Sequence, residues 1–180
     1  MRILRENTVA LVVDIQEKLF PHIHDNEQLK KNMEILVDGL KALEVPMMVT
    51  EQYKKGLGAT IQGLSEKVAT CPTFEKMAFS CLDDEAFTQK FENEGYKTAI
   101  LFGVEAHICL LQTALDLKAE GYVPIVVEDC VGSRNPENKR IAISRMFQQG
   151  IIVTSYESLL FELCRFAGSD TFKTISKLVK

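Results

Sequence analysis

Apolar and polar positions alternate along the chain in two recurring patterns, one typical of buried strands and one of amphipathic helices. Residues 8–14, TVALVVD, are apolar except for the first threonine and the closing aspartate, as in a strand that is covered on both faces of a sheet. Residues 26–44 instead repeat apolar side chains at helical spacing, as Leu36 and Leu40 show. The chain is therefore expected to begin with a buried strand that is followed by an amphipathic helix.

The same two patterns continue to the end of the chain. Short β-rich runs predict further strands at 45–52, 70–76, 97–104, 123–129 and 150–155. Longer runs with helical periodicity predict helices at 83–95, 107–121, 136–150, 155–166 and 170–180. Pro72 cannot donate a ladder hydrogen bond, so the run at 70–76 is expected at a sheet edge. No linker, repeat or change in composition interrupts the alternation, which predicts one domain over residues 1–180.

Regular alternation of strands and helices predicts an α/β fold with three layers, in which helices cover both faces of a parallel sheet. Right-handed crossovers with one reversal of direction favour a six-stranded, mostly parallel sheet in the order 3-2-1-4-5-6. This order places the strand at 8–14 beside the strand at 97–104. Ligands of such sheets bind at the carboxyl ends of the strands where the winding reverses.

Composition narrows the function classes. The chain has 180 residues and a net charge of −4, and its lysines and arginines form no basic stripe, so no nucleic-acid partner is expected. No apolar run approaches the length of a membrane span, and the short run at the N-terminus is expected to be a strand and not a signal peptide. The five cysteines are widely spaced and odd in number, which favours reduced thiols and a cytoplasmic location.

Two residues with chemical potential follow neighbouring strands of this predicted sheet. Asp14 ends the first strand, and Cys109 lies in the first turn of the helix after the fourth. The free N–H groups and positive dipole of that turn favour a thiolate, and a nearby carboxylate would take or return its proton. Lys76 would lower the thiol pKa further, provided that the loop 76–82 folds back over the sheet. Each residue also has an ordinary structural role: core packing, turn formation or a solvated charge.

Long segments of the chain resemble the isochorismatase-like cysteine hydrolases, and most closely the small isochorismatase-domain-containing proteins. The similarity is carried by LVVDIQEKLFPHI (11–23), FEKMAFSC (74–81) and LFGVEAHICLLQTALDL (101–117). The resemblance implies a Rossmann-like three-layer fold and a catalytic triad. In this triad Asp14 is the general base, Lys76 is the lysine of the family's lysine motif, and Cys109 is the nucleophile. It also implies a cis peptide at Val104–Glu105, with the backbone amides of Glu105 and Cys109 as the oxyanion hole.

The chain departs from two branches of that family. Nicotinamidases bind a metal through an Asp-x-His motif after the second strand, whereas this chain has TEQYKKGLGAT there and no histidine between His24 and His107. Isochorismatase itself lacks the nucleophilic cysteine. What the resemblance then implies is hydrolysis of a small C–N amide, or an ester, through a thioester, with no metal and no cofactor. The expected partner is a small-molecule substrate.

Several side chains near the predicted strand ends are candidates to line the substrate pocket, with core packing as the alternative. They are Gln16, Phe20, Tyr53, Phe79 and His107. Ser133 and Arg134 are possible polar contacts, and the arginine would either bind a substrate carboxylate or pair with an acid of the chain. The pair Gly56 and Gly58 lacks the third glycine and the following helix of a dinucleotide-binding loop.

Other functions remain open at this stage. The same scaffold would serve a non-catalytic interaction protein, and some protozoan relatives are labelled ribonucleases, although the acidic charge argues against RNA. An NAD- or flavin-binding module is disfavoured by the absent glycine loop. The terminal segment 170–180 has an apolar stripe of Phe172, Ile175, Leu178 and Val179. Such a stripe predicts a homo-oligomer, unless the helix folds back on its own domain.

Overall fold

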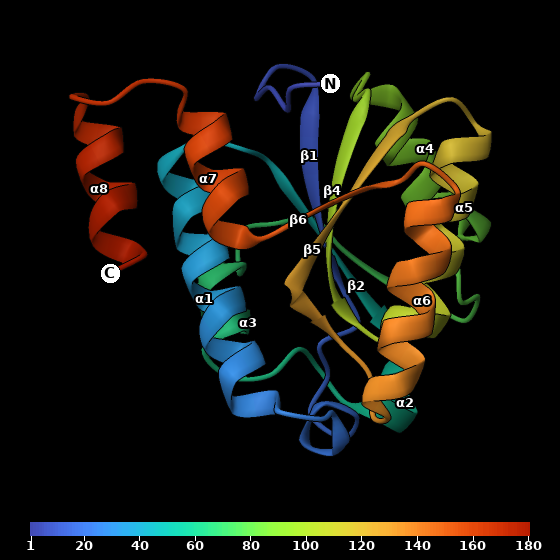
Figure 1. Cartoon of the computed structure of the whole chain (residues 1–180). Coiled ribbons are helices and arrows are strands. Elements are labelled where there is room, and N and C mark those ends of the chain that lie inside the picture. Colours follow the sequence, from blue (N-terminus) through green and yellow to red (C-terminus); the bar gives the residue numbers. More distant parts are fainter.

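The computed structural model describes residues 1–180 and consists of one sheet between two layers of helices (Figure 1). The strands are β1 (Thr8–Val13), β2 (Met47–Gln52), β3 (Thr73–Lys76), β4 (Thr98–Val104), β5 (Val123–Gly132) and β6 (Ile152–Thr154). They form a six-stranded sheet in the order β3-β2-β1-β4-β5-β6, which confirms the predicted order. Every pairing is parallel, so the sheet is wholly parallel where the sequence predicted a mostly parallel one.

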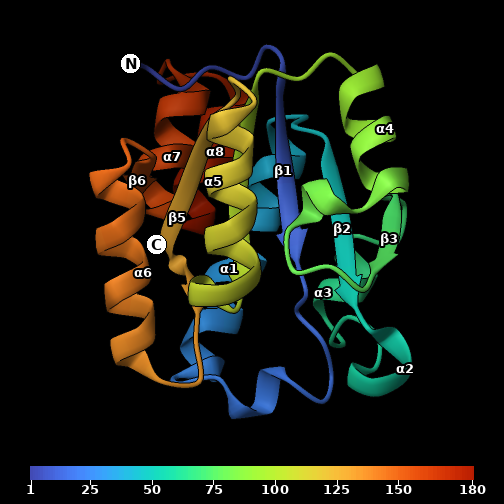
Figure 2. The ribbon, with the colours of Figure 1, turned by 90° about the vertical axis from the view of Figure 1, so that its right-hand side faces the viewer.

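Helices cover both faces of this sheet, as the alternation predicted. One face carries α1 (Asn26–Ala42), α7 (Tyr156–Cys164) and α8 (Asp170–Leu178), and the other carries α4 (Glu85–Asn93), α5 (Leu111–Ala119) and α6 (Pro136–Gln148). In Figure 2 the second group lies in front of the sheet, with β3 and β6 at opposite edges. Short helical turns complete the chain: η1 (Phe20–His22), α2 (Lys54–Leu57), α3 (Leu64–Lys67), η2 (Cys81–Asp83) and η3 (Ala106–Leu110). No helix is both long and apolar enough to cross a membrane.

The position of β1 in the middle of the sheet explains why its sequence is apolar. Successive side chains of a strand point to opposite faces, and both faces of this one are covered. Leu11 and Val13 pack in the core beneath α4, α5 and α6, whereas Ala10 and Val12 pack in the core beneath α1, α7 and α8. Each of the four is at most 1% exposed.

Gly103 permits the close approach of β4 to β1 at the end where Asp14 leaves the sheet. It lies opposite Val13 and has a φ of 129°, a region that other residues rarely adopt. A Cβ atom at this position would lie 2.1 Å from the carbonyl oxygen of Val13. Asp14 itself has a φ of 53°, which turns the chain out of the sheet.

Most predicted elements are a few residues shorter in the structure, and three differences from the sequence prediction concern the edge of the sheet where Asp14 lies. The helix expected from residue 107 begins with the π-helical turn η3, and regular α-helix starts only at Leu111. β5 extends to Gly132, three residues beyond its predicted end, after a register shift against β4. The segment around Gly56, where no helix was expected, contains the single helical turn α2.

The terminal helix α8 folds back on its own domain and does not present its apolar stripe to a partner. Ile175 is fully buried against the core shared with α1 and α7, and Leu178 and Val179 pack at its edge. The rings of Phe161 and Phe172 lie 6.2 Å apart. Figure 1 shows α8 beside α7. The stripe therefore gives no support to a homo-oligomer, because its apolar surface is used within the chain.

Candidate active site

Asp14, Lys76 and Cys109 come together at the carboxyl edge of the sheet. Asp14 directly follows β1, Lys76 is the last residue of β3, and Cys109 lies in η3, the turn that follows β4. Their exposed fractions are 0%, 1% and 6%. The topology therefore collects a carboxylate, an ammonium and a thiol at one buried place. The reversal of winding predicted this position for Asp14 and Cys109.

Asp14 and Lys76 form a buried ion pair. Nζ of Lys76 lies 2.7 Å from Oδ2 of Asp14, and the hydroxyl of Thr50 donates to Oδ1 at 2.8 Å. Thr50 is on β2, between the strands of the two charged residues, and pairs with Val13. Both carboxylate oxygens thus have a donor, which is the condition for keeping a charged carboxylate out of water.

The ammonium of Lys76 also holds the loop that follows it. Nζ donates to Oε1 of Gln52 at 2.8 Å and to the carbonyl oxygens of Ala78 and Phe79 at 3.2 and 3.1 Å. The loop after β3 therefore folds back over the sheet edge, the condition on which the reach of Lys76 to Cys109 depended. Three neutral oxygens and one carboxylate surround the charge of the lysine.

Burial gives Cys109 a neutral thiol. Removal from water is the main cause that raises its pKa, and the negative charge of Asp14 raises it further, while Lys76 acts in the opposite direction. The expectation of a resting thiolate is therefore wrong. For Lys76, burial lowers the pKa, but the negative charge of Asp14 opposes this and the net shift is upward, so the lysine stays charged. The three side chains form one electrostatically coupled group.

Glu105 precedes Cys109 at the point where β4 enters η3. The Val104–Glu105 peptide is cis, as the resemblance implies. The carboxylate of Glu105 is buried and accepts hydrogen bonds from the backbone N of Arg134 at 2.9 Å and from its Nε at 3.1 and 3.2 Å. The backbone N–H of Glu105 donates to no other group of the chain. A role of this amide and that of Cys109 in binding an oxyanion stays a prediction.

A cavity of about 200 Å³, called here the Cys109 pocket, opens above the thiol. Its walls come from five separate segments at the carboxyl edge of the sheet. They are Leu19, Gln52, Leu57, Phe79, Glu105, Ile108, Cys109 and Arg134. The pocket connects the thiol of Cys109 with solvent, so a small molecule can approach the sulfur atom.

Of the side chains predicted to line a pocket, Phe79 lines the Cys109 pocket and the others lie elsewhere. Gln16 is buried and ties two segments together, with Nε2 on the carbonyl oxygens of Gln52 and Gly58. Phe20 is 4% exposed and belongs to the core beneath α1, because η1 turns its ring inward. Neither residue lines the Cys109 pocket, and both organise the segments around it.

Tyr53 and His107 are the remaining two. The ring of Tyr53 covers Gly56 of α2 and is 45% exposed. His107 is held by Ser133, at 3.0 Å from Nδ1, and by Asn138, at 3.3 Å from Nε2. Both rings therefore make their contacts outside the Cys109 pocket. Tyr53 contacts α2, and His107 contacts α6 and the loop before it.

Two residues of the site were not singled out from the sequence, and one was singled out only in part. Thr50 and Gln52 are the polar residues at alternate positions where the apolar run of β2 ends, and this pattern could have identified them. Glu105 was noted only for its backbone, whereas its carboxylate binds Arg134. Arg134 thus pairs with an acid of the chain, which is one of its two predicted roles.

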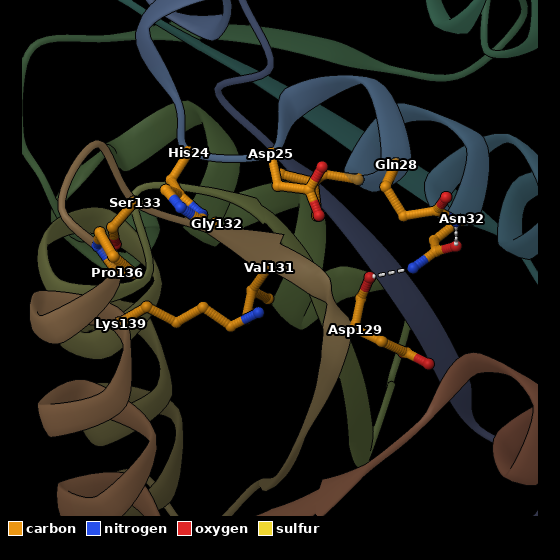
Figure 3. Close-up of a pocket in the computed structure, with 11 residues that line it drawn as sticks. His24, Asp25, Gln28, Asn32, Asp129, Val131, Gly132, Ser133, Pro136 and Lys139 are labelled. Carbon is orange, nitrogen blue, oxygen red and sulfur yellow. Dashed lines mark hydrogen bonds between the residues drawn. The ribbon is translucent and has the colours of Figure 1, made fainter.

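A second cavity, of about 310 Å³, lies between α1, the end of β5 and α6. Figure 3 shows Lys139 reaching into it from α6, opposite Asp25 and His24, with Asn32 bonded to the backbone oxygen of Asp129 at 2.8 Å. It contains no residue of the predicted triad.

Metal binding is a separate question. In the whole chain, no group of three or more His, Cys, Asp or Glu side chains lies together in a way that could hold a metal ion. Metal independence of the activity stays a prediction.

Comparison with known proteins gives one consistent result. Residues 8–158 match the family model described as the isochorismatase domain. The chain is 37% identical over 183 residues to the secreted isochorismatase effector Isc1 of Phytophthora sojae, covering 99% of this chain and 87% of that protein. It is 38% identical over 173 residues to isochorismatase domain-containing protein 1 of Salmo salar, covering 96% of this chain and 61% of the salmon protein.

Solved structures show the same relationship. The MAR1 ribonuclease of Caenorhabditis elegans superposes with a TM-score of 0.92 at 34% identity, over 99% of this chain and 92% of that one. YcaC of Escherichia coli, described as an octameric hydrolase of unknown specificity, superposes with a TM-score of 0.93 at 25% identity, over 99% and 89% of the two chains. The three-layer fold is therefore shared along nearly the whole length.

Proposed function

The chain belongs to the isochorismatase family of hydrolases, and from that premise we propose that it cleaves a small amide, or an ester, through a thioester on Cys109. The observation that carries the proposal is the buried Asp14–Lys76 ion pair, coupled to a thiol at the base of an open pocket. A carboxylate beside a neutral thiol is the arrangement that nucleophilic catalysis requires, because the nucleophile must lose its proton as it attacks.

In the first half of the reaction the Cys109 sulfur attacks the carbonyl carbon while its proton passes to Asp14. The oxyanion that forms would accept hydrogen bonds from the backbone amides of Glu105 and Cys109, and the N–H of Glu105 has no other partner in the chain. The C–N bond then breaks, and the proton held by Asp14 moves to the departing nitrogen. An amine, or ammonia, leaves and an acyl-thioester remains on Cys109.

The second half reverses these roles. A water molecule gives a proton to Asp14 as its oxygen attacks the thioester carbon, and the carbon–sulfur bond breaks. The thiolate then recovers the proton, and a carboxylic acid leaves the pocket. Lys76 keeps its charge throughout, because Asp14 and three oxygen acceptors surround it, and its ammonium holds the carboxylate of Asp14 in place.

The test is a screen of small amides and esters with wild type, Cys109→Ala and Asp14→Asn. We expect turnover in wild type and a loss of at least about 10³-fold in Cys109→Ala, since the covalent route disappears. Asp38→Asn, which removes a partly exposed carboxylate of α1 that is paired with Lys67, is the matched control and should keep full activity. Undiminished turnover in Cys109→Ala would refute the proposal.

Two other functions give different outcomes in the same experiments. A non-catalytic interaction protein would show no turnover and a thiol that small alkylating agents leave unmodified. A ribonuclease would degrade RNA, and Cys109→Ala would degrade it more slowly than wild type. The second idea is supported by the name of the C. elegans relative, and the net charge of −4 of this chain disfavours binding to a polyanion.

Assembly and location extend the proposal. We expect a homo-oligomer because YcaC, which shares the fold at 25% identity, is described as octameric. A cytoplasmic location is the expectation from five free cysteines, although the Phytophthora relative is named as secreted. Fractionation of cells that produce the protein would decide between the two locations.

A further inference from the structure

We propose that the Cys109 pocket selects substrates whose acyl group is uncharged and apolar, with Phe79 as the residue that sets this specificity. The inference rests on the proposed function for the identity of the site. It goes beyond that function in naming the chemical class of the substrate, and it can be tested without turnover.

The walls of the Cys109 pocket carry the first part of the argument. Leu19, Leu57, Phe79 and Ile108 provide four apolar side chains around the sulfur atom. Apolar cavities of about 150 Å³, lined by similar side chains, bind an aromatic ring. A pocket of about 200 Å³ therefore has room for one ring or a short branched chain.

The charges at the pocket carry the second part. Glu105 is paired with Arg134, and Asp14 is paired with Lys76, so the charged groups around the sulfur cancel in two pairs. The side chain of Arg134 is 58% exposed, and its charge is therefore largely solvated. A charged acyl group would lose its own hydration in this pocket and find no unpaired opposite charge in return. An uncharged group avoids that cost.

The position of Phe79 carries the third part. Phe79 lines the pocket and is 53% exposed, so it forms the part of the wall that an entering group meets at the opening. Its carbonyl oxygen accepts a hydrogen bond from the ammonium of Lys76. The residue that pairs with Asp14 thus also holds the loop that carries the aromatic wall. Selectivity and catalysis are therefore linked through Lys76.

The rival interpretation gives Arg134 a carboxylate to bind. Only its Nε and backbone N–H groups contact Glu105, so its two terminal nitrogens are free to form a bidentate pair with an anionic substrate. An anionic acyl group is then preferred, and the preference disappears when Arg134 is changed. The two interpretations predict opposite orders of reactivity for a matched pair of probes.

The experiment measures the alkylation rate of Cys109 by peptide mapping with three probes: iodoacetamide, iodoacetate and N-benzyl iodoacetamide. Each rate is divided by the rate of the same probe with N-acetylcysteinamide, which removes intrinsic reactivity. We expect the neutral iodoacetamide to exceed iodoacetate by at least about tenfold on this scale, and the benzyl probe to exceed iodoacetamide. Phe79→Ala should remove the benzyl preference, so that the relative rates of the benzyl probe and iodoacetamide become equal within about twofold.

Phe166→Ala is the matched control, because Phe166 is an aromatic residue that is 71% exposed and lies after α7, away from the Cys109 pocket. It should change no ratio. A relative rate for iodoacetate that equals or exceeds that for iodoacetamide would overturn the proposal. If Arg134→Gln then lowered the iodoacetate rate, Arg134 would be the residue that binds the carboxylate. A Cys109 that no probe modifies would also overturn it. If the predicted ratios hold while no amide or ester is hydrolysed, only the proposed function fails.

Discussion

Nζ of Lys76 lies 2.7 Å from Oδ2 of Asp14, although 62 positions separate the two residues in the chain. Both side chains are at most 1% exposed, so neither charge is compensated by water. Each depends on the other, and removal of one partner leaves a buried charge that is strongly unfavourable. The pair also sets the electrostatic surroundings of Cys109, since Asp14 raises and Lys76 lowers the pKa of that thiol.

Asp14→Asn should separate the reactivity of the thiol from catalysis. Removing the negative charge that raises the pKa of Cys109 should increase its alkylation rate by iodoacetamide at pH 7.5 by several fold. Hydrolysis should fall at least about 100-fold, because no group remains to accept and return the proton. Circular dichroism checks that the variant is folded. A variant with slower alkylation would contradict the electrostatic assignment.

Alkaline pH should destabilise the fold through the second buried thiol, Cys81. Burial raises its pKa to about 11, and Asp14 adds to the shift. Between about pH 9 and pH 11 the unfolded chain loses this proton while the folded chain keeps it, so the free energy of unfolding falls as pH rises, by roughly 2–3 kcal/mol. Urea unfolding under reducing conditions at pH 7.5, 9 and 10.5 measures the loss. Cys81→Ala should show a smaller loss, which isolates this group from the lysines and tyrosines.

Gly103→Ala should destabilise the protein by about 2–4 kcal/mol, because a Cβ there combines backbone strain with overpacking. That atom would meet the carbonyl oxygen of Val13, one residue before Asp14, so activity should fall as well. Gly95→Ala is the control: its φ is also positive, but a Cβ has no atom within 4 Å. Thermal unfolding compares the two, and equal costs would show that the contact with β1 is unimportant.

Ile175→Ala should lower the free energy of unfolding by roughly 2–4 kcal/mol, as expected for a fully buried isoleucine. Lys177→Ala, an exposed change two residues further along α8, should cost little. The mass in solution should be the same in both variants and in wild type, because α8 packs within its own chain. A change of oligomeric state in Ile175→Ala alone would show that α8 takes part in the contact between chains.

Light scattering at micromolar concentration should give the mass of a homo-oligomer, which is at least twice the 20.3 kDa of one chain. Closed symmetry is the usual form of such assemblies. A mass near 20.3 kDa would show a monomer and remove the oligomer from the proposal.

The predictions from sequence succeeded and failed for identifiable reasons. Asp14 was identified because a lone acid ends an otherwise apolar run, and the structure places it beside Lys76. Gln16 and Phe20 were assigned to the pocket because they follow that strand. Their actual contacts, with Gln52 and with the core beneath α1, depend on loops whose path no local pattern records. Proximity to a strand end locates a region and leaves the direction of each side chain open.

The sequence by itself determined the α/β class, the strand order and the edge of the sheet where the chemistry would lie. These features follow from hydrophobic periodicity and from the handedness of crossovers, and both act locally along the chain. Only the tertiary structure decided that the loop after Lys76 folds back, that Cys109 carries a neutral thiol and that α8 packs on its own domain. Those outcomes depend on burial and on contacts between distant segments. Burial and the charge of Asp14 raise the pKa of the Cys109 thiol, and the apolar stripe of α8 is covered within the chain only because α1 and α7 lie beside it.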